Sequence, residues 1–176
     1  VDAYKFLARE HILLNSLTDL IKGARTEELP ERISDMLNKM KEIEKELAAV
    51  RSAQALSQAG DLAKSAKDIN GYTFIASVMS DGVSGDDLRK IAIDLRAQHS
   101  NSVVALLSNN DGKPVLVVAV SDEARAKGVK AGALVKIGST VLGGGGGGKD
   151  DFAQGGGTNP GASLDAIAAI SQSLLG

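Results

Sequence analysis

The chain has 176 residues, with 20 lysines and arginines, 22 aspartates and glutamates, and a formal net charge of −2. This balance argues against a protein that coats nucleic acid with its whole surface. The absence of cysteine excludes disulfides, thiol catalysis and zinc bound by cysteine, and it is compatible with a reducing cytoplasm. His11 and His99 lie far apart in the sequence, which argues against a histidine metal cluster.

The start of the chain is charged and helical in pattern, and it shows no signal peptide. No apolar run approaches the roughly twenty residues that a membrane-spanning helix needs. The first residue is Val1 in place of an initiator methionine, which indicates a fragment of something longer.

Two helices are expected first. Apolar residues recur at helical spacing from Asp2 to Gly23, and Gly23 suits a C-terminal cap. Pro30 fits the first turn of a second helix, which we expect over residues 31–67, with Gly60 weakening or bending it. The second helix carries a heptad seam formed by Ile33, Met36, Met40, Ile43, Leu47 and Val50.

Such a seam needs a partner. The favoured partner is the first helix, folded back as an antiparallel hairpin; the other is the same helix of a second chain. Residues 1–68 are therefore expected to form a helical arm, either a long-helix hairpin or a coiled coil that could dimerise.

A small α/β domain is expected over residues 69–176, with Asn70-Gly71 marking its start. Strands are predicted over 72–79, 102–107 and 114–120, with a hairpin turn at 109–112. A helix capped by Ser84 separates the first two strands, so these should be parallel, and the third antiparallel. The resulting fold class is α+β with a mixed sheet.

The end of the domain is expected to be helical around a glycine-rich loop. Ser121 can cap a short helix to Lys127, which Gly128 can stop, and a further helix is predicted over 131–142. The loop spans residues 143–157. Ser163 is expected to cap a last helix to Leu175, with an inward face formed by Leu164, Ile167, Ala168 and Leu174.

The stretch GGGGGGKDDFAQGGG, residues 143–157, is the most unusual in the chain. Bare backbone serves either the close approach of a ligand or the contact of two chain segments; a disordered linker is the alternative. The stretch is neither a Walker loop nor a dinucleotide fingerprint, because Asp150 follows Lys149 and no strand precedes the glycines.

Gln154 could read a ribose hydroxyl or a base edge, or could tie the loop to its own backbone. The Asp150–Asp151 pair could serve acid–base or Mg²⁺ chemistry, although adjacent carboxylates are more often simply solvated.

From Ala124 to Lys149 the chain holds five basic residues and no acid. Such a run predicts a local electrostatic footprint for an anionic partner, although the charges could also be scattered over a solvated surface. The basic residues are Arg125, Lys127, Lys130, Lys136 and Lys149.

These motifs resemble the C-terminal region of alanyl-tRNA synthetases. The matching segments are ELPERI with its heptads, LVVAVS, KGVKAGALVK, GGGGGGKDDFAQGGG and the closing helix. The same module resembles the accessory RNA-binding domain of DHH-type phosphoesterases. The resemblance implies a non-catalytic piece without its own cofactor, with ATP and zinc used only by upstream aminoacylation and editing domains. It also implies contact with the elbow of tRNA-Ala, help in bringing both centres to one tRNA, and a contribution to dimerisation.

The leading hypothesis is thus a tRNA-binding module. The candidate RNA-binding residues are Arg125, Lys127, Lys130, Lys136, Gly144, Gly145, Gly146, Gly147, Lys149 and Gln154. Two alternatives stay open: a module that mainly assembles chains through the seam from Ile33 to Val50, and the accessory half of a phosphoesterase whose DHH half is missing.

Overall fold

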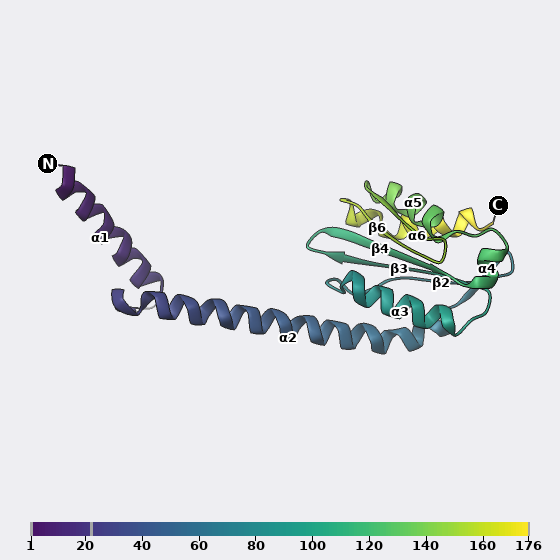
Figure 1. Ribbon diagram of the computed structural model, residues 1–176, viewed down its shortest axis with the longest axis horizontal. Coiled ribbons are helices and arrows are strands. Elements are labelled where there is room, and N and C mark those ends of the chain that lie inside the picture. Colours follow the sequence, from purple (N-terminus) through teal and green to yellow (C-terminus); the bar gives the residue numbers. More distant parts are fainter. Residues whose placement is uncertain (1, 22, 176) are drawn as a thin grey trace. The chain divides into compact units, whose positions relative to one another are not determined.

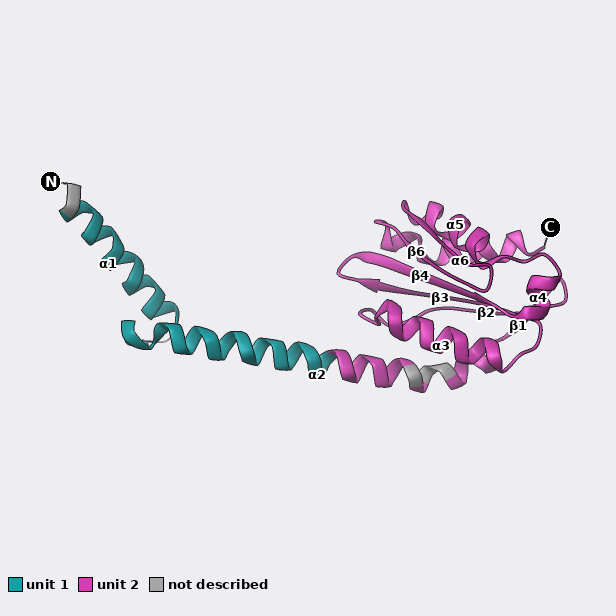
Figure 2. Ribbon diagram, viewed as in Figure 1, with its two compact units in different colours: residues 1–47 teal, residues 48–176 magenta. Residues whose placement is uncertain are grey.

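The computed structural model describes residues 2–21 and 23–175. These residues form two compact units, residues 1–47 and residues 48–176, which Figure 2 shows in different colours. None of the described helices is long and apolar enough to cross a membrane. The units are taken one at a time below.

The first unit contains α1 (Asp2–Leu20), the short 3-10 helix η1 (Thr26–Glu28) and the first part of α2 (Leu29–Lys64). Gly23 has a φ of +74° and its amide donates to the Thr18 carbonyl at 2.9 Å, as expected just after a helix. Pro30 lies in the first turn of α2, where its missing N–H has no partner to lose. The helix continues through Gly60 and ends at Lys64, three residues before the expected end at Lys67.

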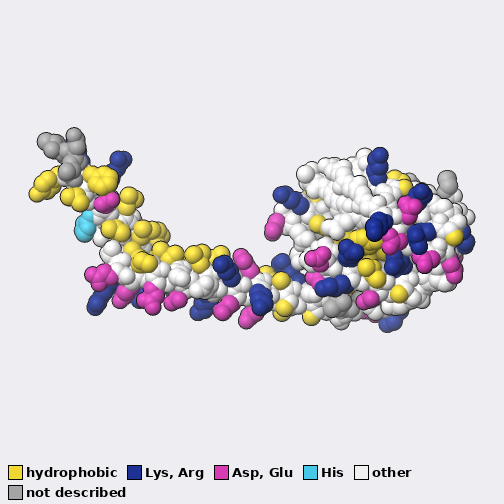
Figure 3. Space-filling view, in the orientation of Figure 1, with side chains coloured by type: hydrophobic (Ala, Val, Ile, Leu, Met, Phe, Trp, Pro, Cys, Tyr) yellow, Lys and Arg dark blue, Asp and Glu magenta, His cyan; other side chains and the backbone are white. Residues whose placement is uncertain are grey.

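The antiparallel helix hairpin expected from the seam does not form. Met36 and Met40 on α2 are each 56% exposed, and Leu20 on α1 is 79% exposed. Instead, the connection between the helices is buried locally at Ala24 and Leu29, next to η1. The apolar stripes of both helices are therefore exposed, and Figure 3 shows rows of hydrophobic side chains along them.

The second unit is built on a six-stranded mixed sheet in the order β1-β2-β3-β4-β6-β5. The strands are β1 (Lys67–Ile69), β2 (Tyr72–Val78), β3 (Ser102–Asn110), β4 (Lys113–Val120), β5 (Gly145–Gly148) and β6 (Phe152–Gly156). As predicted, β2 and β3 are parallel and β4 is antiparallel to β3.

Two tight turns connect neighbouring strands of this sheet. Asp111 and Gly112 join β3 to β4, with φ values of 49° and 75°, as the Asn-Asp-Gly sequence predicts. Asn70 and Gly71 have φ values of 53° and 79° and join β1 to β2. The sequence does not predict the short strand β1, because an Asn-Gly turn signal fits the start of a domain as well as the hairpin that it forms here.

Helices cover both faces of the sheet (Figure 1). On one face, α3 (Gly85–Ala97) buries Leu88, Ile91 and Leu95 together with Ala55 from the second part of α2. On the other face lie α5 (Ala131–Val141) and α6 (Ser163–Ser173), with Val135, Ala166 and Ile170 buried. The short helix α4 (Asp122–Ala126) is capped by Ser121 as predicted.

The last helix corrects two expectations. Ser163 is its first residue and makes no cap; the 3-10 helix η2 (Pro160–Ala162) leads into α6, and the Ser163 hydroxyl donates to the Pro160 carbonyl at 2.6 Å. Leu164 is 74% exposed and Ala168 is exposed, whereas Leu174 is 5% exposed and Ile167 packs against the core as expected, together with the buried Ala166 and Ile170.

Residues 143–157 are not a loop, which is the main correction to the predicted fold. They form most of a β-hairpin, with β6 paired to β4 and β5 at the outer edge of the sheet. Main-chain N–H and C=O groups need hydrogen-bond partners, and a strand ladder supplies them to glycines as well as to any other residue. Side-chain patterning cannot reveal such strands, because glycine has no side chain.

Candidate functional site

The hairpin presents two different faces. The face toward α5 requires glycine: a Cβ on Gly146 would lie 2.6 Å from the Val135 Cγ1, and one on Gly155 would lie 2.8 Å from the same atom. Distances this short are clashes, so these glycines permit α5 to pack closely on the strands. On this face the glycines therefore allow two chain segments to come into contact, which is one of the two uses expected for the bare backbone.

The opposite face has no such requirement. A Cβ on Gly145 or on Gly147 would meet nothing within 4 Å, and neither residue has a left-handed φ. Glycine inside a strand costs roughly 0.5–1 kcal/mol relative to alanine, so the fold alone would favour side chains here. The open face of Gly145 and Gly147 therefore suits the second expected use, the close approach of a ligand.

The edge of β5 adds hydrogen-bonding groups to this open face. The Lys149 amide donates to the Phe152 carbonyl at 2.9 Å, which places Gly147 and Gly145 at the positions bonded to β6. The alternation of an antiparallel ladder then directs the N–H and C=O groups of Gly146 and Gly148 away from the sheet. Among the described residues no strand pairs with that side of β5.

Gln154 projects from the same open face. It lies opposite Gly147 in the register, it is exposed, and its amide nitrogen lies 2.9 Å from where a Cβ on Gly85 would be. Within the described part of the chain its side chain makes no hydrogen bond, so the amide is available to a ligand and does not tie the strand to its own backbone.

Arg89 is a further cation near this face that sequence reasoning missed. Its guanidinium carbon lies 4.8 Å from the centroid of the Phe152 ring, and Phe152 shares the face of Gln154 two residues along β6. A cation over an aromatic ring is held in place without being neutralised. No spacing in the sequence could have found it, because Arg89 comes from α3 and meets β6 only in the folded unit.

The basic run of residues 124–149 does not converge on the glycine face. Arg125 forms an ion pair with Asp122, and Lys130 lies 3.5 Å from Asp150. The hydrogen bond from Arg125 lowers the pKa of Asp122, and the same bond raises the pKa of Arg125. Acids from just outside the run thus offset part of its charge. Figure 3 shows basic and acidic side chains interleaved over the visible face of this unit.

The remaining predicted residues lie in four places. Lys127 lies over the ring of Tyr72, with its Nζ 5.5 Å from the centroid. Lys136 is exposed on the outer side of α5, and Lys149 is exposed in the turn between β5 and β6. Gly144 precedes β5 and is packed, because a Cβ there would lie 2.9 Å from the Gly156 carbonyl carbon.

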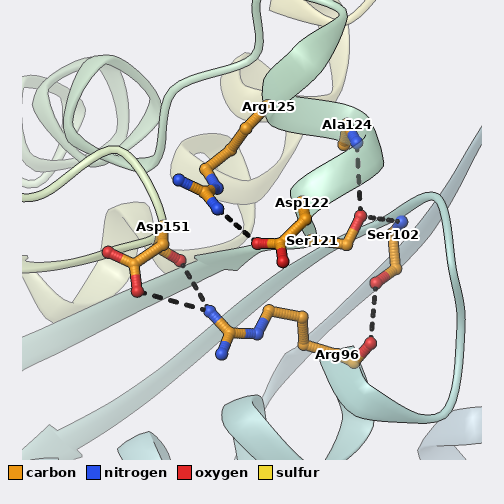
Figure 4. Close-up of polar contacts among 7 residues, drawn as sticks. All are labelled: Arg96, Ser102, Ser121, Asp122, Ala124, Arg125 and Asp151. Carbon is orange, nitrogen blue, oxygen red and sulfur yellow. Dashed lines mark hydrogen bonds and ion pairs between the residues drawn. The ribbon is translucent and has the colours of Figure 1, made fainter.

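Asp150 and Asp151 hold the hairpin turn. The Asp150 carbonyl accepts from Ala131 at 3.0 Å and the Asp151 carbonyl accepts from Val120 at 2.9 Å. Arg96, from the last turn of α3, donates to the Asp151 carbonyl at 3.2 Å and lies 3.7 Å from its carboxylate (Figure 4). The described residues contain no cluster of three metal-ligating side chains at this or any other place. The main-chain carbonyls of both residues therefore anchor the turn, and the Asp151 carboxylate adds its contact with Arg96.

Comparison with known proteins agrees with this architecture. Residues 70–175 match the DHHA1 domain family, and the chain belongs to that family. It is also 32% identical to the C-Ala domain of Aquifex aeolicus alanyl-tRNA synthetase, whose crystal structure matches with a TM-score of 0.60 over 98% of that domain and 63% of this chain.

Two relatives extend the match to nearly the whole chain. The alanine–tRNA ligases of Streptomyces avermitilis and Acidothermus cellulolyticus are 46% and 48% identical over 97% and 96% of this chain. The match covers 19% of each ligase, so the chain spans about a fifth of their length. A part of RecJ of Thermus thermophilus, 21% of that chain, shares this fold over 85% of the present chain, at 13% identity and with a TM-score of 0.50.

Proposed function

We propose that this chain is a non-catalytic tRNA-binding module of an alanine–tRNA ligase. The observation that carries the proposal is the open face of Gly145 and Gly147, where the fold gives no reason for glycine. The similarity of the chain to a C-Ala domain and its membership of the DHHA1 family support the choice of tRNA as the ligand. Aminoacylation and editing, with their ATP and zinc, would belong to domains upstream in a cytoplasmic enzyme.

The RNA would be recognised mainly by its shape and backbone. Bare strands let a ribose–phosphate chain approach the main chain, and the outward N–H groups of Gly146 and Gly148 can donate to phosphate oxygens. Arg89 and Lys149 flank the strands with positive charge, and the Gln154 amide can pair with a 2′-hydroxyl. The tRNA elbow is the part we propose is bound, so that one tRNA can reach both upstream centres; the family resemblance supports this.

A titration with tRNA-Ala transcript at two salt concentrations tests the proposal, with an unrelated tRNA and an unstructured RNA as controls. We expect salt-sensitive binding of both tRNAs and much weaker binding of the unstructured RNA. Lys149→Ala combined with Arg89→Ala, which removes the two cations that flank the strands, should weaken binding and flatten its salt dependence in a folded protein. The matched control is Lys39→Ala with Lys113→Ala, which removes equal charge elsewhere. Equal effects of the two pairs would contradict the site.

Self-association is a second candidate function, favoured by the exposed seam on α2. Ile43 and Val50 are 58% and 64% exposed, and a helix stripe of this kind is normally covered. Sedimentation over a range of concentrations should detect a dimer, and Met40→Glu with Ile43→Glu should abolish it without affecting the sheet. A chain that stays monomeric at every concentration would exclude this role.

A further inference from the structure

A hollow of about 310 Å³ lies near the end of the sheet where β2 begins, away from the open glycine face. Tyr72 and Lys127 line it together with Lys130, Leu134, Ile137 and Leu174. Its size is at the lower end of the range for small-ligand sites. All of these residues belong to the second unit, so the hollow is defined within one compact body.

The hollow combines an aromatic ring with apolar walls. The aromatic ring is that of Tyr72, which is only partly buried. The other aromatic rings of residues 48–176 lie elsewhere: Phe74 is 5% exposed, and Phe152 lies under Arg89. Leu134 and Ile137 from successive turns of α5 form the wall. The Asn70 amide donates to the Leu174 carbonyl at 3.3 Å and joins the end of α6 to the strand that carries Tyr72.

Two ammonium groups stand at the rim. In the described part of the chain Lys127 makes no ion pair, and it lies within cation–π distance of Tyr72. Lys130 is paired with Asp150 at 3.5 Å, but their side chains are 61% and 58% exposed, so water weakens the attraction and another anion can replace the carboxylate. Both lysines can therefore turn to an incoming phosphate.

An aromatic ring, an apolar wall and two cations together match a nucleotide: a planar base beside a charged phosphate. We propose that this hollow takes one unstacked nucleotide of the bound RNA, with its base stacked on Tyr72 and its phosphate between Lys127 and Lys130. The inference rests on the proposed RNA binding and adds a second contact surface, formed by α5 and β2, to the glycine face.

The chain suits a direct test, because it holds two tyrosines and no tryptophan. Protein labelled with 3-fluorotyrosine should give two ¹⁹F resonances, assigned with Tyr4→Phe and Tyr72→Phe. On addition of tRNA-Ala transcript the Tyr72 resonance should shift, whereas Tyr4, which is 86% exposed in the first unit, should serve as the internal control. Tyr72→Ala should weaken binding about 5- to 100-fold, Tyr72→Phe much less, and Tyr4→Ala not at all.

The outcomes separate this inference from the proposed function. Binding of tRNA with an unmoved Tyr72 resonance and unchanged affinity of Tyr72→Ala would overturn the nucleotide site alone. A Tyr72 resonance that moves with protein concentration in the absence of RNA would also overturn it, because a second chain would then occupy the hollow. Failure of the unmodified chain to bind tRNA at low salt would overturn both.

Discussion

Gly146 lies directly against Val135, whereas Gly147, the next residue of the same strand, faces open space. A Cβ on Gly146 would come within 2.6 Å of the Val135 Cγ1, and a Cβ on Gly147 would meet nothing within 4 Å. The alternation of a strand places successive residues on opposite faces, so one glycine run serves both packing and access.

This relationship predicts opposite effects of the same substitution on stability. Gly146→Ala should lower the free energy of unfolding by about 1–3 kcal/mol, because the added methyl group overpacks α5 against the hairpin. Gly147→Ala should leave stability unchanged or raise it by up to about 1 kcal/mol. Urea denaturation of the two variants checks this, and equal losses in both would contradict the difference between the faces.

The contacts of Arg96 with Asp151 predict a local effect on the hairpin turn. Arg96→Ala should speed hydrogen exchange at the amides of Val120, Ala131 and Lys149, whose acceptors lie in or beside the turn. Global stability should fall by no more than about 1 kcal/mol, because the Asp151 carboxylate is partly exposed. Arg125→Ala is the matched control, since its ion pair with Asp122 lies within α4. Unchanged exchange in Arg96→Ala would show that the turn is held by its backbone alone.

Ser84 and Asp87 predict a pH-dependent contribution from the start of α3. The Ser84 hydroxyl donates to the Asp87 carboxylate at 2.8 Å and accepts from the Asp87 amide at 3.1 Å. This hydrogen bond holds the pKa of Asp87 below its ordinary value of 3.8 in the folded state. A lowered folded-state pKa contributes stability above the ordinary value, and that stability is lost as pH falls through the folded pKa.

Ser84→Ala should therefore raise the pKa of Asp87 and lower stability at neutral pH by about 1 kcal/mol, as for other lost helix caps. A carboxyl NMR titration measures the pKa, and Ser84→Thr, which keeps a hydroxyl, is the control. An Asp87 pKa that does not respond to Ser84→Ala would refute the assigned cause.

Much of the fold could be predicted because its elements carry local signals. Ser84 and Ser121 are caps followed by acids, and the turn at Asp111-Gly112 has the residues that positive φ requires. The glycine strands could not be predicted as strands, since strand patterns are recognised by side chains. β1 could not be predicted for a different reason: a turn signal such as Asn70-Gly71 is compatible with a domain boundary and with a hairpin alike.

The candidate site was only partly predictable for a similar reason. Gly145, Gly147 and Gln154 came from the glycine stretch itself, and they share one face. Arg89 reaches that face from α3, and spacing along the sequence cannot predict a contact between two separate elements. The basic run seemed free of acids along the chain, but folding brings Asp150 to Lys130 and leaves Asp122 beside Arg125.

The affinity of Gly147→Val for tRNA-Ala tests the central claim most directly. Valine favours strands and has open space at this position, so the variant should fold as stably as the unmodified chain. If RNA backbone approaches the bare strand, the isopropyl group should block it and reduce affinity at least tenfold at low salt. A folded Gly147→Val that binds tRNA-Ala as tightly as the unmodified chain would contradict the proposed interface.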